Sequence, residues 1–401
     1  MKRIIALFCC LILVFCLMST PASAAGAWTH IIDVVCVNGA TIALRDDGRV
    51  LYTGDPAIPA SRDVGSWSNI EWIEAVGSDY LVGYRASGEV FLTLLRVPYD
   101  SSDLPFRQAD VADWTDVRKL VISGDFCYGL CYDGSFYWVV YGQDAYATAQ
   151  ITNSWPSLVD VATDGYGMVA GLTADGNVLC TDPAALTNAG GYWGSDPLRA
   201  SDWSRVSEIY CNGFGLYGVR SDRVLGIGRS GWNNVRSLYF APDSMFGLRY
   251  DGSVAANFSE YFSTDDRLQQ IDRWRGIVQL GFDGSGGFRY VPVGLKSDGT
   301  IAAVTTFDGY SYGEWDFSGW SGITELYSGT EYTIGQRSDG SLLVTGGEFD
   351  TLDYLGQVGQ WRTVRAVFPA KGEYTDHIVA LLTDGTLVAA GDNSYGQCNV
   401  G

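Results

Sequence analysis

Histidine and lysine are scarce in this sequence. Its 401 residues include two histidines, His30 and His377, and only three lysines beyond residue 24, which are Lys119, Lys296 and Lys371. Two histidines cannot supply a multi-histidine metal site, and no Cys-x-x-Cys pair is present to replace them. With a net charge of −20, a chain so poor in lysine repels phosphate backbones and anionic lipids. We therefore expect neither nucleic-acid binding nor membrane-surface binding.

The sequence also lacks recognisable catalytic or nucleotide-binding motifs. No nucleophile elbow, phosphate-binding loop or dinucleotide fingerprint is evident, and no two carboxylates are singled out as a catalytic pair. We predict that the protein is not an enzyme and assign no catalytic residue, cofactor or metal ligand. A hydrolase with an unrecognised carboxylate pair remains an alternative.

Long apolar runs are absent except at the amino terminus. There, Lys2 and Arg3 precede an apolar stretch to Met18, and Ala22-Ser23-Ala24 ends the segment. This pattern predicts a secretory signal peptide over residues 1–24, cleaved after Ala24, and the alternative is an uncleaved anchor. We expect a soluble, secreted, monomeric product.

Six cysteines remain beyond the signal segment, namely Cys36, Cys127, Cys131, Cys180, Cys211 and Cys398. An even number in an oxidising compartment requires that disulfides be considered. Cys127 and Cys131 lie four apart in one predicted strand, which separates their Cα atoms by roughly 13 Å, too far for a bond. We expect mostly buried free thiols.

A repeat of about 42 residues fills the rest of the chain. Its nine units begin at Trp28, Trp67, Trp114, Trp155, Trp203, Trp232, Trp274, Trp320 and Trp361. In seven units a turn residue, usually the Asp of an Asp-Gly pair, follows the tryptophan by 19 or 20 positions. Alternating apolar runs flank each Asp-Gly, which predicts a hairpin closed by a two-residue primed turn.

Three or four antiparallel strands per unit, without helical periodicity, predict an all-β chain folded as one β-propeller over residues 25–401. We expect mostly four-stranded blades and nine units in one ring, with the last unit pairing with the first. The unit from Trp203 is only 29 residues long, so eight full blades plus a remnant is the alternative.

The segments VGLKSDGTIAAV (293–304) and ALLTDGTLVAAGDNSYGQCNV (380–400) resemble the regulator-of-chromosome-condensation repeat, especially its bacterial form. The resemblance implies a β-propeller that acts by binding other proteins. The family's eukaryotic namesake is a nucleotide-exchange factor, but a secreted acidic protein would not meet that partner, so we do not expect this activity.

Two regular features of the units have structural explanations. The Asp-Gly aspartates are turn residues rather than a ring of calcium ligands or catalytic acids. Two positions before the turn residue, six units carry a cation, and we expect it to pair with nearby acids rather than to receive an anionic partner. These cations are Arg45, Arg85, Arg220, Arg249, Lys296 and Arg337.

Departures from the repeat are the better candidates for function. Segments 90–113, 181–202, 255–273, 305–319 and 346–360 lengthen the path from third strand to next tryptophan. Loops on a rigid scaffold commonly carry binding sites, and exposed Tyr and Trp are typical of interfaces and of sugar stacking. We predict that an extracellular protein, or alternatively a glycan or cell wall, binds through these loops. The candidate residues are Tyr192, Trp193, Tyr310, Tyr312, Trp315 and Tyr354.

Overall fold

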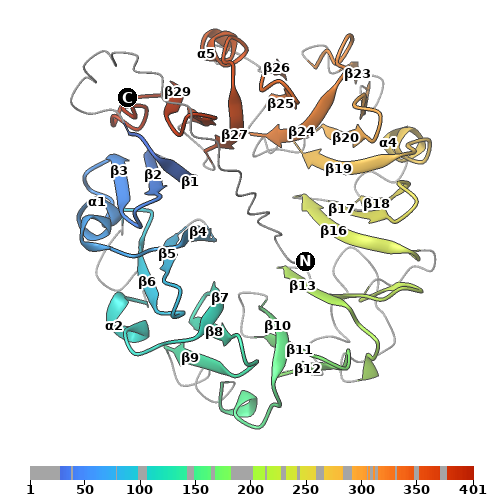
Figure 1. Cartoon of the computed structure of the whole chain (residues 1–401). Coiled ribbons are helices and arrows are strands. Elements are labelled where there is room, and N and C mark those ends of the chain that lie inside the picture. Colours follow the sequence, from blue (N-terminus) through green and yellow to red (C-terminus); the bar gives the residue numbers. More distant parts are fainter. Residues whose placement is uncertain are drawn as a thin grey trace, which may run out of the picture.

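The chain forms a ring of small β-sheets arranged around a central axis like the blades of a propeller (Figure 1). The computed structural model describes residues 28–37, 39–77, 79–97, 106–141, 149–163, 168–181, 202–212, 215–226, 232–241, 244–258, 266–282, 291–304, 306–307, 310–311, 315–329, 332–346, 352–370 and 377–401. Within these residues each sequence unit holds one three-stranded antiparallel sheet, and the seventh unit adds a two-stranded hairpin. The all-β prediction is confirmed.

The first strands of the nine units are β1 (Ile31–Val37), β4 (Trp72–Val76), β7 (Val117–Ser123), β10 (Leu158–Thr163), β13 (Glu208–Asn212), β16 (Val235–Ala241), β19 (Ile277–Phe282), β24 (Ile323–Ser328) and β27 (Val364–Pro369). The second strands are β2 (Ala40–Arg45), β5 (Tyr80–Tyr84), β8 (Phe126–Cys131), β11 (Val169–Thr173), β14 (Gly215–Val219), β17 (Ser244–Arg249), β20 (Pro292–Lys296), β25 (Tyr332–Arg337) and β28 (His377–Leu382). The third strands are β3 (Val50–Gly54), β6 (Val90–Leu94), β9 (Phe136–Val140), β12 (Val178–Cys180), β15 (Val224–Leu225), β18 (Val254–Phe258), β21 (Ile301–Ala303), β26 (Leu342–Gly346) and β29 (Leu387–Gly391).

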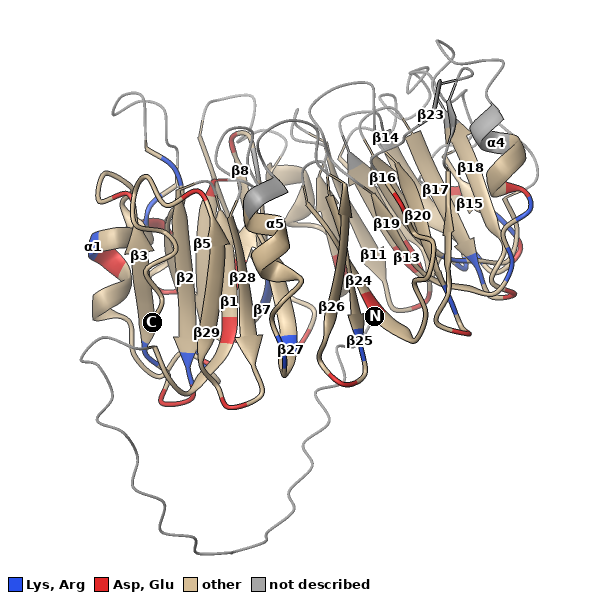
Figure 2. Ribbon diagram, turned by 90° about the horizontal axis from the view of Figure 1, so that it is seen from above, with Lys and Arg blue, Asp and Glu red and all other residues tan. Residues whose placement is uncertain are grey.

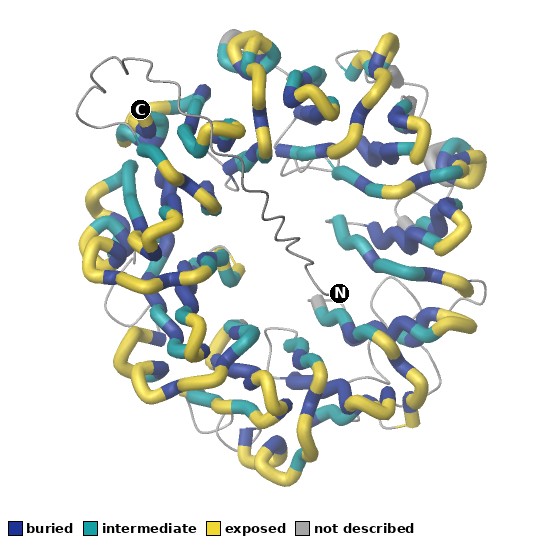
Figure 3. The backbone as a smooth tube through the Cα atoms, viewed as in Figure 1, coloured by how far each residue is buried: buried dark blue, intermediate teal, exposed yellow. Residues whose placement is uncertain are grey.

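The second strand is the middle strand of every three-stranded sheet, with the first strand nearest the axis and the third on the outside (Figure 1). Neighbouring sheets cover both of its faces, so every residue of β5, β8 and β11 is buried (Figure 3). Burial on both faces explains why these strands read as continuous apolar runs rather than as a strict alternation.

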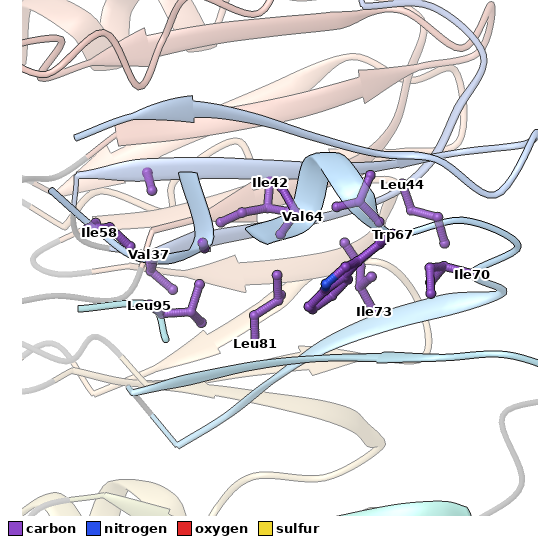
Figure 4. Close-up of a cluster of buried hydrophobic side chains, with 13 residues drawn as sticks. Val37, Ile42, Leu44, Ile58, Val64, Trp67, Ile70, Ile73, Leu81 and Leu95 are labelled. Atoms are coloured by element: carbon purple, nitrogen blue, oxygen red, sulfur yellow. The ribbon is translucent and has the colours of Figure 1, made fainter. Parts of the chain in front are cut away.

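Nine apolar clusters hold the ring together, one at each interface between neighbouring units. The cluster between the first two units joins Ile42 and Leu44 to Trp67, Ile73 and Leu81 (Figure 4). Each unit therefore buries its apolar faces only against its neighbours, and a closed ring leaves no unit with an uncovered face.

The repeat tryptophan lies over a glycine of the second strand in seven units. A Cβ atom on Gly335 would lie 2.6 Å from the ring of Trp320, so no larger residue fits beneath it. The first and last units have Ala43 and Ala380 at the matching register position. The other six pairs are Trp67 and Gly83, Trp114 and Gly129, Trp155 and Gly171, Trp203 and Gly218, Trp232 and Gly247, and Trp274 and Gly294.

The Asp-Gly turns are one residue longer than the sequence predicted. Arg45 N–H donates to Arg49 O at 2.9 Å and Gly48 N–H donates to Arg45 O at 3.0 Å, which encloses three loop residues rather than two. Gly48 adopts a left-handed φ of 77°, as in a type I turn followed by a bulge. The prediction of a two-residue primed turn is therefore wrong, although a glycine with positive φ is needed in both turn types.

The same glycine also joins each unit to the next. Its carbonyl accepts a hydrogen bond from the N–H of the third residue after the next unit's repeat tryptophan. Between the first two units this bond joins Ile70 N–H to Gly48 O at 3.0 Å. Eight of the nine interfaces have this bond in the described residues. The other seven pairs are Gly88 and Val117, Gly134 and Leu158, Gly176 and Val206, Gly252 and Ile277, Gly299 and Ile323, Gly340 and Val364, and Gly385 and Ile31.

The last of these pairs closes the ring between the last and first units, an interface that we call the seam. Ile31 N–H donates to Gly385 O at 3.0 Å, and Trp28 N–H donates to Val400 O at 3.2 Å. One apolar cluster includes Ile31 and Val34 of the first unit together with Val379 and Val400 of the last. The expected contact between the first and last units is confirmed.

The expected fourth strand is not seen in the described residues. Several units instead place a short helix beside the third strand, namely α1 (Ala60–Asp63) with the 3-10 turn η1 (Val64–Ser66), α2 (Gln108–Val111), α4 (Asp266–Ile271) and α5 (Leu352–Val358). In the second unit, the side-chain amide of Gln108 accepts from Leu92 N–H and donates to Val90 O, at 2.7 and 3.0 Å. Its side chain thus occupies the edge that a fourth strand would pair with.

Buried thiols account for several of the cysteines. Cys36, Cys127 and Cys131 are buried free thiols, as expected, and burial raises the pKa of each. Cys398 is a half-buried free thiol whose pKa is raised to about 11. The proposed signal peptide, residues 1–24, lies outside the described residues. No helix within the described part of the chain has the length and apolar character needed to span a bilayer.

Candidate binding surfaces

The two faces of the ring are built differently. The turns between second and third strands lie on one face, which we call the Asp-Gly face, where Figure 2 shows Lys, Arg, Asp and Glu gathered along the lower edge. The turns between first and second strands, and the ends of the third strands, lie on the opposite face, which we call the loop face. All five lengthened segments predicted from the sequence contain or follow the end of a third strand, so each leaves the ring on the loop face. Those strands end at Leu94, Cys180, Phe258, Ala303 and Gly346.

On the Asp-Gly face the turn aspartates have a structural role. Asp298 Oδ1 accepts from the N–H and the hydroxyl of Thr300 at 2.9 and 2.6 Å. Asp133, Asp251 and Asp384 bond in the same way to the Ser or Thr two positions later. These hydrogen bonds lower the pKa of all four carboxyl groups. The aspartates hold the turns, as the sequence predicted.

The cations two positions before the turn residue are also engaged within their own hairpins. Arg85, Arg249 and Arg337 each donate from Nε to the carbonyl of the residue after the repeat tryptophan, at 3.0, 3.2 and 3.0 Å. Arg45 and Arg220 pair with the turn aspartate of their own hairpin. These contacts favour the structural interpretation of the cations over a receptor for an anionic partner.

Three of the predicted partner-binding residues, Tyr192, Trp193 and Tyr312, lie outside the described residues. Tyr310 lies in the short hairpin of β22 (Thr306–Phe307) and β23 (Tyr310–Ser311), between the third strand of the seventh unit and Trp320. The binding role of these four residues therefore stays a prediction.

The remaining two predicted residues, Trp315 and Tyr354, are half-buried rather than fully exposed. Trp315 packs against the apolar cluster of the seventh and eighth units, which contains Trp320. Tyr354, on α5, packs against the cluster of the eighth and ninth units. Both side chains cover blade edges, which was the structural alternative for the loop aromatics.

A buried polar network crosses the seam. His377 Nε2 lies 2.8 Å from Thr41 Oγ1, and the Thr41 hydroxyl donates to Gln397 O at 2.8 Å. Because that hydroxyl has one proton, His377 Nε2 must carry hydrogen and donate to Thr41. All three residues are fully buried, and burial lowers the pKa of His377 to about 4, opposed by the nearby carboxylate of Asp392. The histidine is thus neutral and has a structural role.

One serine-hydrolase letter pattern occurs, GYSYG at residues 309–313. A nucleophile elbow needs a strand that turns sharply into a helix, whereas Ser311 ends the two-stranded hairpin of β22 and β23. Among the described residues, no three His, Cys, Asp or Glu side chains are grouped so that they could hold a metal ion.

Two exposed tyrosines on the Asp-Gly face were missed by the sequence reasoning. Tyr250 is 70% exposed and Tyr132 is 59% exposed, more than any other large apolar side chain in the described residues. Each directly precedes an Asp-Gly-Ser turn. The recurring letters Tyr-Asp-Gly-Ser are the signal in the sequence, and they lie in the regular turns rather than in the lengthened segments.

Comparison with known families supports the resemblance found in the last unit. The family model for the regulator of chromosome condensation (RCC1) repeat matches residues 374–397. This stretch comprises β28, the Asp-Gly turn, β29 and the loop that follows. No curated protein matches the sequence significantly.

Three solved structures illustrate the likeness in fold. The computationally designed Ika8 protein is 12% identical, with a TM-score of 0.39 over 80% of this chain and 98% of that one. Prp20p from Saccharomyces cerevisiae is 11% identical (TM-score 0.35; 90% and 82% covered), and BamB from Moraxella catarrhalis is 12% identical (TM-score 0.36; 92% and 99% covered). The ring arrangement itself rests on the strand pairing and interface clusters described above.

Proposed function

We propose that the protein is a secreted, non-enzymatic scaffold that binds an extracellular protein through the loop face. One observation carries this proposal: every lengthened segment leaves the ring on that face, while eight of the nine turns on the opposite face share the same backbone hydrogen bonds. A rigid ring that varies on one face only matches the way binding loops are presented on stable scaffolds. Proteins with the RCC1 type of repeat mostly act by binding other proteins, and the match at residues 374–397 agrees with this role.

The decisive experiment compares variants on the two faces. Tyr192→Ala with Trp193→Ala, the loop-face variant, alters the lengthened segment 181–202 that follows β12, and Tyr132→Ala with Tyr250→Ala alters the Asp-Gly face. Each protein is used to capture partners from spent culture medium, followed by mass spectrometry and titration of the purified partner. We expect the loop-face variant to weaken binding about tenfold or more, as loss of a hot-spot aromatic does. Equal binding by both variants and the wild type would contradict the proposal.

Carbohydrate or cell-wall binding through the same loops is the second candidate. Trp and Tyr rings stack on the apolar faces of sugars, and the loop aromatics Trp193 and Tyr192 are of this kind. A glycan array probed with the wild type and the loop-face double variant tests it. Glycan signal that disappears in that variant, with no captured protein, would favour this candidate over the first.

Secretion is tested separately. We propose cleavage after Ala24, so the protein recovered from culture medium should begin at Ala25. Amino-terminal sequencing or intact mass measurement checks this directly. A protein that stays cell-associated with residues 1–24 attached would support the uncleaved anchor instead.

A further inference from the structure

The Asp-Gly face carries two copies of one surface patch, each made of a tyrosine, an arginine and a valine. The tyrosine directly precedes the turn aspartate. The arginine is the fourth residue after the repeat tryptophan of the same unit, and the valine is the fourth residue after the repeat tryptophan of the next unit. In the two copies the valines are 43% and 42% exposed, and the tyrosines are also exposed. The first copy is Tyr132, Arg118 and Val159, and the second is Tyr250, Arg236 and Val278.

The same hydrogen bonds build both copies. Arg118 Nη2 donates to Val159 O, and Arg236 Nη2 donates to Val278 O, each at 2.6 Å. Tyr132 N–H donates to the carbonyl of Asp116 at 2.9 Å, and the second tyrosine donates equivalently to Asn234 at 3.0 Å. These two shared hydrogen bonds, three units apart, are a feature of the fold rather than of one loop.

A third position in the ring has the same framework but no aromatic. Arg365 occupies the arginine position in the last unit, and Ile32 of the first unit, 41% exposed, occupies the valine position. Thr383 stands where the tyrosine would be, and its N–H donates to Thr363 O at 2.9 Å as in the other two. The ring therefore contains a comparable position that shares the arginine, a β-branched aliphatic residue and the backbone hydrogen bond but has no phenol ring.

Size and charge restrict what these patches can bind. Three side chains per patch are far fewer than the roughly 20–30 residues that a specific protein interface uses on each side. Each tyrosine directly precedes a turn aspartate, Asp133 or Asp251, so each patch includes an acid as well as an arginine and neither sign of charge dominates. The chain as a whole, at −20, repels polyanions. A small, neutral ligand with both polar and apolar surface fits best.

We propose that the two patches bind neutral sugar residues of one polysaccharide. The tyrosine ring packs on the C–H face of a sugar, the valine extends the apolar contact, and the remaining guanidinium N–H groups bond to hydroxyls. Arg118 is held by two carbonyls, because its Nε also donates to Cys131 O at 3.1 Å. It therefore loses little side-chain freedom on binding. A repeating polymer engages both patches at once, and bivalency strengthens an otherwise weak contact.

Co-sedimentation with insoluble cellulose, chitin, β-1,3-glucan and starch tests the proposal. We expect the wild type to bind at least one of these polymers. Tyr132→Ala or Tyr250→Ala should weaken that binding about tenfold or more, and the double variant should abolish it. Thr383→Tyr completes the third patch and should strengthen binding by a similar factor.

Circular dichroism of each variant controls for folding, and Tyr192→Ala with Trp193→Ala, in the lengthened segment 181–202, is the control outside the two patches. The proposal fails if the wild type binds none of the four polymers, or if the double variant binds as the wild type does. It also fails if only the Tyr192 and Trp193 variant loses polymer binding. It fails as well if the Tyr132 and Tyr250 double variant still binds polymer but no longer captures a protein that the wild type captures. Failure here leaves the proposed function of the loop face intact, because the two experiments alter different residues.

Discussion

The seam and the interface after the fifth unit depart from the regular junction in opposite ways. At the seam, Ile31 N–H still donates to Gly385 O, and the network of Thr41, His377 and Gln397 is added to it. After the fifth unit, the glycine bond is missing from the described residues. In its place Val224 N–H donates to the carbonyl of Trp232 at 2.7 Å.

The missing bond follows from one deleted residue. Arg220 N–H donates to Arg223 O at 2.9 Å, which encloses two loop residues where the other hairpins enclose three. The residue that is absent is the glycine whose carbonyl would face Val235. The third strand of this unit, β15, is also the shortest, with two residues.

The difference between these two interfaces reflects whether the chain itself connects the two units. The fifth and sixth units are joined by the chain itself, which keeps them close even when one hydrogen bond is lost. No peptide bond joins the last unit to the first, so contacts at the seam must offset the entropy of keeping the two ends together. Chain connectivity therefore accounts for both the added hydrogen bonds at the seam and the missing hydrogen bond after the fifth unit.

Removal of residues 397–401, which lie at the seam, should destabilise the protein more than any other change proposed below. The deletion takes away the carbonyl acceptors of Thr41 and Trp28 and the buried side chain of Val400. Lost burial and unsatisfied polar groups together should destabilise the protein by about 3–5 kcal/mol. Urea unfolding measures the loss, and deletion of the exposed Gly401 alone is the control. An unchanged midpoint would show that the seam is not the weak point of the ring.

The pH dependence of the seam should be the next largest effect. Burial lowers the pKa of His377 from 6.5 to about 4. Between these values the unfolded chain binds a proton that the folded chain does not, so stability is complete above pH 6.5 and falls as pH drops toward 4. The loss between pH 7 and 4.5 should be about 2.5 kcal/mol.

His377→Gln should remove most of this pH dependence, because glutamine can still donate to Thr41 but does not titrate. Urea midpoints at pH 7 and 4.5 measure it, with His30→Gln, at an exposed histidine of the same unit boundary, as the control. The pairing of the turn aspartates is lost only at lower pH, since hydrogen bonds depress the pKa of those groups. An identical pH profile in wild type and His377→Gln would assign the acid sensitivity to other groups.

Thr41→Val should have a smaller effect, because it removes one hydroxyl without changing volume. The substitution leaves His377 N–H and Gln397 O buried without their partner, at a cost of about 2 kcal/mol. Thr53→Val is a matched control in the same seam, since the half-buried Thr53 hydroxyl donates to Gly396 O at 2.7 Å. Its loss should cost about 0.5–1 kcal/mol. Equal effects in thermal unfolding would mean that burial of the network is unimportant.

The periodic features of the fold could be predicted from the sequence, because each recurs in nearly every unit. The tryptophans, the apolar runs and the Asp-Gly pairs set the strand order, the turn glycines and the contact between the first and last units. Turn length was mispredicted, because Asp-Gly occurs both in two-residue turns and in longer ones closed by a bulge. The choice depends on the hydrogen-bond register around Gly48, which single-sequence patterns do not contain.

The candidate sites were harder to predict, because exposure is a tertiary property. Trp315 and Tyr354 were expected to be exposed, but both are half-buried and pack against the apolar clusters of the seventh and eighth units and of the eighth and ninth units. Tyr132 and Tyr250 have the same chemistry and stand in regular repeats, yet the structure exposes them. Departure from a repeat indicates where a loop lies, but not which side chains on it reach solvent.

Insertion of one glycine between Asp222 and Arg223 should have the smallest effect and the opposite sign. The insertion lengthens the turn to the three residues of the other hairpins and supplies a carbonyl that can accept from Val235 N–H. One regained hydrogen bond should stabilise the protein by about 0.5–1.5 kcal/mol, measured as a raised urea midpoint. Insertion of alanine at the same place is the control, because the residue needs positive φ and alanine resists it. Destabilisation by both insertions would mean that the bond between Val224 and Trp232 had already made the short turn the better one.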